Sequence, residues 1–471
     1  MLYVLLRSVA GIALRWFYSR IDVEGLERIP AKAPVLLAVN HPNALVDALV
    51  VAWVFPRRIV LTAKATLFRN PAFAAFFRAA GVVPLIRRQD VAPLQSSKET
   101  QRNERAFGAL NGALARGRAV LIFPEGITGD HPSLAPLRTG AARIALEARD
   151  SGVTGLSIVP VGLTFERKDA PRTRVFVQVG EAIDVDGWPR SDAASDAAAL
   201  TAELERRLRA VTLNFETADD AARATALASS FARLFRGVDS VPPVWHPHAP
   251  LSDQVSIARR VEDARARLAT APNDMRSRAD ALLRRLSGFT EMLTENRIAI
   301  EDLEIALDVP SGTRLVIRET PVVLLAGPFA LWGWVNHVLP FNLSRLIANR
   351  SIESAADPAM RTIVNGIGLV LLFYLAQGAV VWAVFGPLAA AIYWISLPIA
   401  ADVNFYLRAR LSRVVRRARA YFLFRRHPEL QERLTRELQW LRAEALAIDA
   451  TLAPNQGSRR IDTTSTIGPT M

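Results

Sequence analysis

Two long apolar runs near the end of the chain place the strongest limit on its fold. Residues 363–385 and 387–407 each approach the ~20 apolar residues that a helix needs to cross the hydrocarbon core of a bilayer. Gly386 and Pro387 stand where the two runs meet, and this dipeptide is typical of a turn. The sequence therefore predicts a transmembrane helical hairpin and a multi-pass membrane protein.

A third apolar stretch, residues 321–340, precedes the hairpin and is less regular. It is interrupted by Gly327 and Pro328 and carries two tryptophans, an asparagine and a histidine. Irregular backbone at membrane depth occurs where it is covered by protein or lines a cavity. We expect a re-entrant or interfacial segment here, and so two full spans in total. Four shorter passes are the alternative.

Charge sets the expected orientation of the hairpin. Eight arginines and no acidic residue lie between residues 408 and 426, and such clusters stay on the cytoplasmic side. With two spans, the N-terminal part of the chain lies on that same cytoplasmic face, whereas three spans would separate them. The formal net charge of +13 beside 51% hydrophobic residues also favours contact with membrane lipids over binding to nucleic acid.

Cysteine is absent from the chain, which excludes disulfides, thiolate nucleophiles and cysteine-metal sites. Only four of the 58 basic residues are lysines. Such a bias is typical of genome composition, so the abundance of arginine is weak evidence about function.

The sequence of residues 1–20 predicts a helix that does not span a bilayer. Residues 1–20 mix short apolar runs with arginines and lack a signal-peptide cleavage site. The longest uncharged run, residues 8–14, is too short to cross. We predict an interfacial amphipathic segment over residues 1–33. A helix docked on the protein surface is the alternative.

Residues 34–215 alternate between strand and helix patterns. Apolar runs of strand length lie at residues 35–39, 58–63, 82–86, 119–123, 157–163 and 174–179. Helical patterns lie at residues 44–54, 72–79, 97–115, 139–150 and 197–214. This alternation predicts an α/β fold with a mostly parallel sheet flanked by helices. Catalytic groups are expected where strands give way to helices.

The rest of the chain divides by composition. Residues 216–318 are polar, with helical patterns at 219–236 and 253–309, and predict a helical linker domain. Residues 319–407 form the membrane region, and residues 408–471 a basic cytoplasmic helix with a disordered tail from Pro454. His246 and His248 lie in a proline-rich loop without a third ligand nearby, so we predict a turn and no metal site.

His41 follows the first strand pattern directly, and Asp47 comes six residues later. A carboxylate can orient an imidazole while its free nitrogen removes a proton from a hydroxyl. Pro42 delays the next helix and Asn43 can cap it. Residues six apart do not share one face of a helix, so the pairing requires His41 to lie outside it. A structural histidine is the alternative.

Six further candidates follow later strand patterns. They are Lys64, Arg87, Arg88, Glu125, Gly126 and Arg138. Arginines at a strand end can clamp a phosphate, and a glycine beside a glutamate lets a polar substrate approach the backbone. The amides of the helix start after Arg138 can add to anion binding. A solvated surface and a simple turn are the alternatives.

The order and spacing of these groups resemble the four-motif signature of the glycerolipid acyltransferases, the glycerol-3-phosphate and 1-acylglycerol-3-phosphate O-acyltransferases. The motif segments are residues 40–47, 81–87, 123–126 and 159–162, within a resemblance that covers roughly residues 20–215.

The resemblance implies an acyltransferase domain at residues 34–215. It would move a fatty acyl group from acyl-CoA or an acyl-carrier protein to a glycerol-phosphate hydroxyl in phospholipid biosynthesis, without metal or cofactor. By position it implies catalysis by His41 and Asp47, and acceptor binding by Arg87, Glu125 and Gly126.

Two departures from the family pattern bear on the acceptor. Five residues separate His41 from Asp47 where the family usually has four, which resembles the branch acting on glycerol-3-phosphate or dihydroxyacetone phosphate. Ile127 and Thr128 follow Gly126 where the family usually has threonine and arginine. Arg88 or Arg138, with Lys64, would then supply the missing charge. Another lipid acceptor, or a non-catalytic lipid-binding protein on the same fold, stays open.

Overall fold

The computed structural model describes residues 2–69, 71–85, 96–129, 131–168, 170–235, 250–307, 309–350 and 358–452. The chain forms two compact units. The first comprises Met1–Thr225, Val241–Ser256 and Arg314–Arg413, and the second comprises Ala226–Ser240, Ile257–Thr313 and Val414–Met471.

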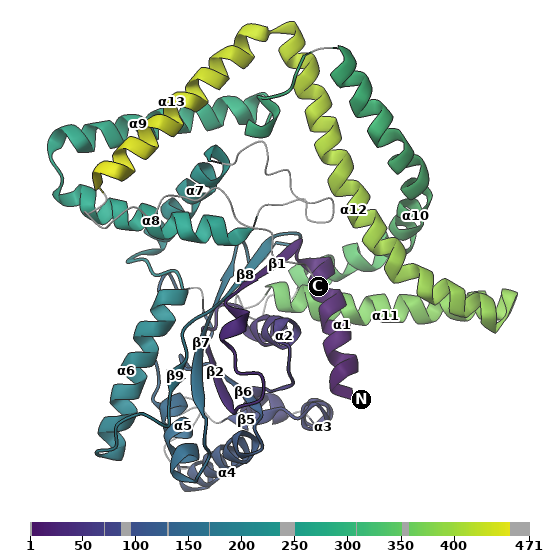
Figure 1. Ribbon diagram of the computed structural model, residues 1–471. Helices are drawn as coiled ribbons and strands as arrows, with labels where there is room; N and C mark the ends of the chain where they lie inside the picture. The colour runs from purple at the N-terminus through teal and green to yellow at the C-terminus, as the bar shows by residue number, and fades with distance from the viewer. Residues whose placement is uncertain are drawn as a thin grey trace. The chain divides into compact units, whose positions relative to one another are not determined.

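A mostly parallel sheet forms the centre of the first unit (Figure 1). Its strands are β1 (Arg20–Glu24), β2 (Val35–Val39), β3 (Ile59–Val60), β6 (Ala119–Ile122), β7 (Ser157–Phe165), β8 (Arg174–Val179) and β9 (Ile183–Asp184). The order is β1-β8-β7-β2-β6-β3, with β9 on β7. Only the pairs β7–β8 and β7–β9 are antiparallel in this sheet as described. A separate parallel pair joins β4 (Thr62–Lys64) and β5 (Val83–Leu85).

The central strand β2 is buried on both faces because every one of its residues is apolar. Val35, Leu37 and Val39 enter one core, while Leu36 and Ala38 enter the other. Helices α1 (Leu2–Phe17) and α2 (Ala44–Val54) cover the first face, and helices α4 (Ser96–Ala115), α5 (Gly140–Asp150) and α6 (Ala193–Val211) cover the second. A further helix, α3, is Pro71–Ala80. The predicted α/β fold is confirmed.

The sequence patterns predict neither β9, which has only two residues, nor strand β1. Its sequence, RIDVE, alternates polar and apolar residues over five positions, and no residue of it is fully buried. It pairs only with β8, in parallel, so it lies at an edge of the sheet where polar side chains are tolerated.

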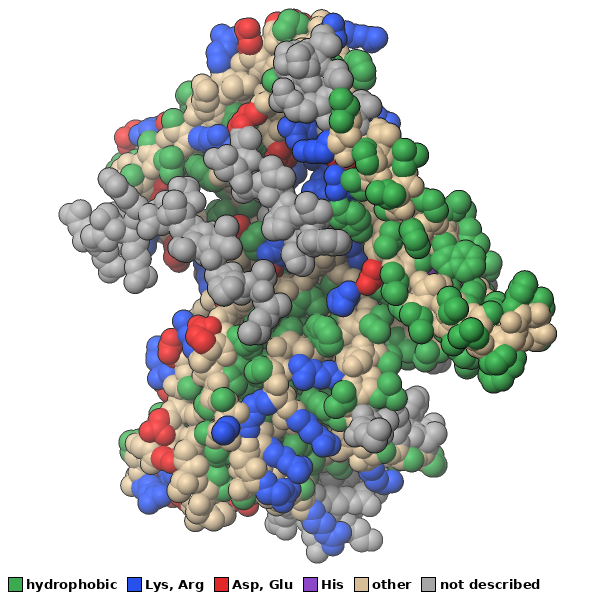
Figure 2. All heavy atoms as spheres, turned by 45° about the vertical axis from the view of Figure 1, so that its right-hand side comes forward, with side chains coloured by type: hydrophobic (Ala, Val, Ile, Leu, Met, Phe, Trp, Pro, Cys, Tyr) green, Lys and Arg blue, Asp and Glu red, His purple; other side chains and the backbone are tan. Residues whose placement is uncertain are grey.

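Three helices of the described chain are long and apolar enough to cross a membrane. They are α10 (Val309–Arg350), α11 (Pro358–Phe385) and α12 (Pro387–Arg426), whose outward side chains are largely hydrophobic (Figure 2). The predicted turn is confirmed, since Gly386 links α11 to α12 with a φ of 87° that favours glycine. Helix α10 continues through Gly327 and Pro328, so the main chain is not interrupted there, and the expected re-entrant or interfacial placement stays a prediction. Neighbouring helices can support a helix around a proline, and Gly333 of α10 packs directly on Ala400 of α12.

The second unit is helical. Its elements include α9 (Asn273–Glu295), α13 (Pro428–Leu452) and parts of α7 (Ala218–Leu234), α8 (Leu251–Thr270) and α12. Helices α9 and α13 share a core that includes Phe289 and Leu441, and the ion pair between Arg285 and Glu437 joins their outer faces. The helix predicted over 253–309 is two helices, α8 and α9. His246, His248 and the tail from Pro454 lie outside the described residues.

Candidate active site

His41 and Asp47 meet at the carboxyl end of β2. The structure places His41 in the loop before α2, outside the helix, and Asp47 in the first turn of α2. Nδ1 of His41 lies 3.0 Å from Oδ2 of Asp47, and the two residues are 8% and 0% exposed. An ionised carboxylate only accepts, so Nδ1 carries the proton in this pair and Nε2 keeps its lone pair.

Asp47 is held by main-chain as well as side-chain donors. Its Oδ2 also accepts a hydrogen bond from the Asn43 amide at 2.7 Å, and its Oδ1 has no partner among the described residues. Burial raises the pKa of Asp47, although the hydrogen bonds from His41 and Asn43 and the charge of Lys168 act in the opposite direction. The fold therefore disfavours the charged form of Asp47, and such perturbed carboxylates often occur at functional sites.

The imidazole of His41 stacks on the ring of Phe123, with centroids 3.8 Å apart and planes 14° from parallel. Its main-chain N–H donates to Oε1 of Glu125 at 2.8 Å. Both partners belong to the segment after β6, which runs parallel to β2 in the sheet. The carboxyl ends of these two strands thus bring the first and third motifs together.

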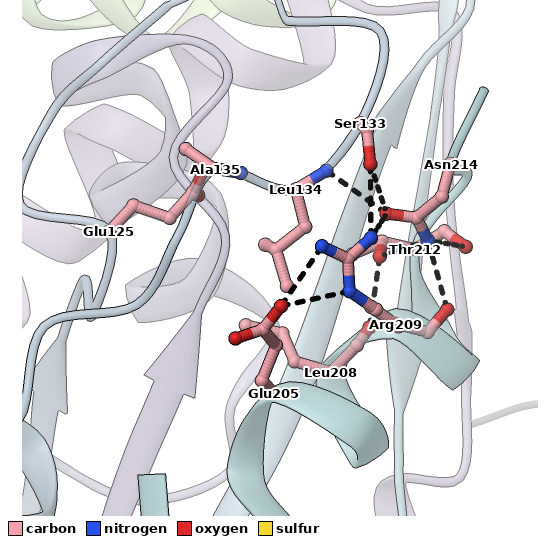
Figure 3. Close-up of polar contacts among 9 residues, drawn as sticks. All are labelled: Glu125, Ser133, Leu134, Ala135, Glu205, Leu208, Arg209, Thr212 and Asn214. Atoms are coloured by element: carbon pink, nitrogen blue, oxygen red, sulfur yellow. Dashed lines mark hydrogen bonds and ion pairs between the residues drawn. The ribbon is translucent and has the colours of Figure 1, made fainter. Parts of the chain in front are cut away.

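Both carboxylate oxygens of Glu125 accept main-chain hydrogen bonds. Oε2 accepts from the Ala135 amide at 3.0 Å, and Glu125 is 7% exposed. The loop around Ala135 is anchored on its other side by Asn214, whose Oδ1 accepts from the Leu134 amide and from Ser133 (Figure 3). Glu125 therefore braces the His41 loop against a fixed loop. Its predicted contact with an acceptor stays a prediction.

Gly126 has a φ of 68°, which lies in the left-handed region that other residues adopt at a cost. A Cβ at this position would lie 3.4 Å from Cγ of Arg138. Arg138 is exposed, and its amide donates to the carbonyl of Pro124 at 2.8 Å. The structure thus places Arg138 beside the glycine of the third motif.

The His41 loop is strained and is fixed from several sides. Ala44 adopts a φ of 44°, a conformation that costs about 1–3 kcal/mol for a residue with a Cβ. Asn40 exchanges two hydrogen bonds with the main chain of Leu163 in β7. The amide side chain of Asn43 donates to the buried hydroxyl of Tyr18, whose pKa is raised by burial and by the charge of Asp47.

Two lysines come at or just after strand ends. Lys64 ends β4, and Lys168 follows β7, where its positive charge acts to lower the pKa of Asp47. Sequence reasoning missed Lys168 and Tyr18. Lys168 had a signal, because it is one of only four lysines and follows a strand pattern. Arg87 and Arg88 lie outside the described residues.

The described residues contain no group of three or more histidine or carboxylate side chains that could hold a metal ion.

Comparison with known proteins finds similarities to part of this chain. A family profile described as Acyltransferase matches residues 20–164. A 1-acyl-sn-glycerol-3-phosphate acyltransferase of Cocos nucifera is 29% identical over 188 residues, which are 38% of this chain and 55% of that protein. The chain thus spans about half the length of that relative.

Two further proteins are similar to parts of this chain. Glycerol-3-phosphate O-acyltransferase 2 of Saccharomyces cerevisiae is 37% identical over 86 residues, covering 18% of this chain and 12% of that protein. The crystal structure of the lysophosphatidate acyltransferase PlsC from Thermotoga maritima aligns with a TM-score of 0.31 and 20% identity, over 43% of this chain and 78% of that chain.

Proposed function

We propose that the acyltransferase-family domain at residues 20–164 makes this chain a membrane-bound O-acyltransferase for a glycerol-phosphate acceptor. The acceptor is glycerol-3-phosphate or lysophosphatidate, and the product serves phospholipid synthesis. The observation that carries this proposal is the buried hydrogen bond between His41 Nδ1 and Asp47 Oδ2 at the carboxyl end of β2.

The reaction follows from this geometry. Nε2 of His41 takes the proton of the acceptor hydroxyl while the oxygen attacks the thioester carbonyl carbon. Asp47 stabilises the resulting imidazolium. The tetrahedral intermediate then expels the thiolate, which receives the proton from Nε2, so that an ester and a thiol result. The Asn43 amide donates to Asp47, and we assign stabilisation of the oxyanion to the next amides at the start of α2.

Basic residues at the carboxyl edge would bind the phosphate. Lys64 ends β4, and Arg138 lies beside Gly126 of the third motif. We assign the same role to Arg87 and Arg88. Acyl-CoA or an acyl-carrier protein supplies the acyl group. We place the catalytic domain at the cytoplasmic face, supported by the arginines at 408–426 that follow the α11–α12 hairpin.

Acyl transfer by the purified full-length protein tests this function. Thioester donors of both kinds are combined with glycerol-3-phosphate, lysophosphatidate and other lipid acceptors, and the products are identified by mass spectrometry. We expect His41→Ala to lower kcat by about 10²–10⁴-fold, as loss of a general base does. His427→Ala, on an exposed histidine of the second unit, should keep the normal rate.

A folded His41→Ala variant with the wild-type rate would refute the mechanism. Wild-type protein that forms no ester from any donor and acceptor pair would instead support the non-catalytic alternative.

A further inference from the structure

The α11–α12 hairpin provides a scale of depth in the membrane. Its two feet, which are the parts of α11 around Ile363 and of α12 around Asp402, contact the catalytic domain. Ile363 of α11 is part of the core beneath β2, and Asp402 of α12 accepts hydrogen bonds from Arg15 and Trp16 of α1. Gly386, at the tip, lies at the far end of both helices. A residue beside either foot is therefore at the level of the catalytic domain.

Both ends of the apolar stretch in α10 lie at the level of these feet. Glu319 forms an ion pair with Arg410 at 2.5 Å, and the ring of Phe341 stacks on Phe405 with centroids 5.8 Å apart. At 1.5 Å per residue, Arg410 and Phe405 are about 7.5 Å apart along α12, whereas about 33 Å of helix separates Glu319 from Phe341. A helix that crossed the bilayer would bring one end to the level of the tip.

The middle of this stretch makes the deepest contacts with the hairpin. A Cβ on Gly333 would lie 2.1 Å from the carbonyl oxygen of Ala400, so the two helices touch there. Asn336 accepts a hydrogen bond at 2.7 Å from the hydroxyl of Tyr393, a residue about 10 Å along α12 from the tip. Helix α10 thus descends to this depth and returns. Its three internal prolines remove main-chain hydrogen bonds and permit the bend.

The outer face of α10 is apolar, while its polar side chains face inward. Glu319, Asn336 and His337 are buried against α11 and α12. Residues on the outer face recur at helical spacing and are highly exposed, Leu325 to 75% and Leu339 to 61%. Also on this face are Ile317, Leu324 and Val335, whereas the partly exposed Trp332 donates a hydrogen bond to Ser396 of α12. Such an exposed apolar stripe fits the acyl chains and head-group boundary of a lipid leaflet.

We propose that α10 does not span the membrane but lies as a bowed interfacial helix in the leaflet on the side of the catalytic domain. Its outer apolar face contacts lipid, and α11 and α12 are the two spans among the described helices. The catalytic domain and the arginines at 408–426 then share one side. This inference rests on the membrane location in the proposed function and not on acyl transfer.

Labelling of single cysteines tests the topology, because the natural chain contains none. Ser151→Cys reports the catalytic domain, Ser287→Cys reports the chain before α10, and Phe385→Cys reports the hairpin tip. In sealed vesicles of known orientation, an impermeant maleimide should label Ser151→Cys and Ser287→Cys from the same side and Phe385→Cys from the opposite side. Labelling of Ser287→Cys from the side of Phe385→Cys would show that α10 crosses.

Depth measurements give a second test. A bimane label on Leu325→Cys should be quenched more by lipids brominated near the head group than by lipids brominated at the chain end. A spanning α10 would instead place Leu325 near the bilayer centre. The opposite order of quenching would overturn the proposal. Monodispersity in detergent reports the fold of each variant. Neither measurement reads catalysis, so failure of the proposed chemistry leaves both results interpretable.

Discussion

The buried carboxylate of Asp47 should reduce the stability of the fold while it supports the proposed reaction. Burial raises its pKa above the unfolded value of about 3.9. The folded state therefore binds the proton more tightly, so stability is highest below the unfolded pKa and falls as pH rises through the folded pKa. A substitution that removes the charge of Asp47 should therefore remove this decrease in the free energy of unfolding.

Asp47→Asn tests that balance. We expect kcat to fall by about 10²–10⁴-fold because the imidazolium loses its partner. The free energy of unfolding of the variant, relative to that of the wild type, should rise between pH 4 and pH 7. Chemical unfolding in detergent at a series of pH values measures this difference. A variant that loses relative stability as pH rises would contradict the assignment of a costly buried charge.

We expect Lys168 to bind the negative charge of the acceptor, because it is a compact cation after β7 whose charge acts on Asp47, and because Ile127 and Thr128 follow Gly126 in the third motif. Lys168→Ala should raise KM for a phosphorylated acceptor by about 10–100-fold, as loss of a charged hydrogen bond does. Lys168→Arg should restore part of the affinity. The neighbouring Arg167→Ala is the control. Equal effects of Lys168→Ala on phosphorylated and uncharged acceptors would exclude this role.

At the scale of elements, α1 connects the membrane helices to the active site. Asp402 of α12 holds its last turn through Arg15 and Trp16, and Tyr18, just beyond that turn, accepts a hydrogen bond from Asn43 in the His41 loop. Residues at and just beyond the end of α1 thus link α12 to the strained loop. We expect this link to keep the loop in its reactive conformation.

A double-mutant cycle measures the link. Tyr18→Phe and Asp402→Asn should each lower kcat several-fold, and the double variant should lose less than the product of the two effects because both break one connection. Coupled neighbours show about 0.5–3 kcal/mol of non-additivity. Tyr3→Phe, at the other end of α1, is the control. Independent effects of the two substitutions would show that α1 does not transmit position.

The elements around the active site show which features could be predicted from the sequence and which could not. Strand β2 and helix α2 could be predicted to the residue, because buried apolar runs and a proline before the helix are local signals. The pairing of His41 with Asp47 was also local. The contacts of Tyr18 with Asn43 and of Trp16 with Asp402 join residues far apart in the chain, and no pattern within either segment specifies its partner. Helix α10 also continues through Gly327 and Pro328, and it packs on α12 further along, at Gly333, a contact that no local pattern specifies.

At the scale of the whole molecule, the membrane hairpin contributes to the core of the catalytic domain. Ile363, in the first turns of α11, is 4% exposed and packs in the same cluster as residues of β2, α1 and α2, whereas its neighbour Val364 is 47% exposed. The catalytic domain is therefore completed by a residue that lies far beyond residue 215 in the sequence. Truncation before α11 would leave this part of the core open.

Ile363→Ala should consequently destabilise the catalytic domain. Truncation of a buried isoleucine to alanine typically costs about 2–5 kcal/mol, since it removes apolar contacts and leaves a cavity. Val364→Ala, one position away on the exposed face, should change stability by less than about 0.5 kcal/mol. Thermal unfolding in lipid nanodiscs, followed by proteolysis within residues 20–215, compares the two variants. If both variants unfold at the wild-type temperature, the hairpin is only an anchor, and the catalytic domain forms its core without it.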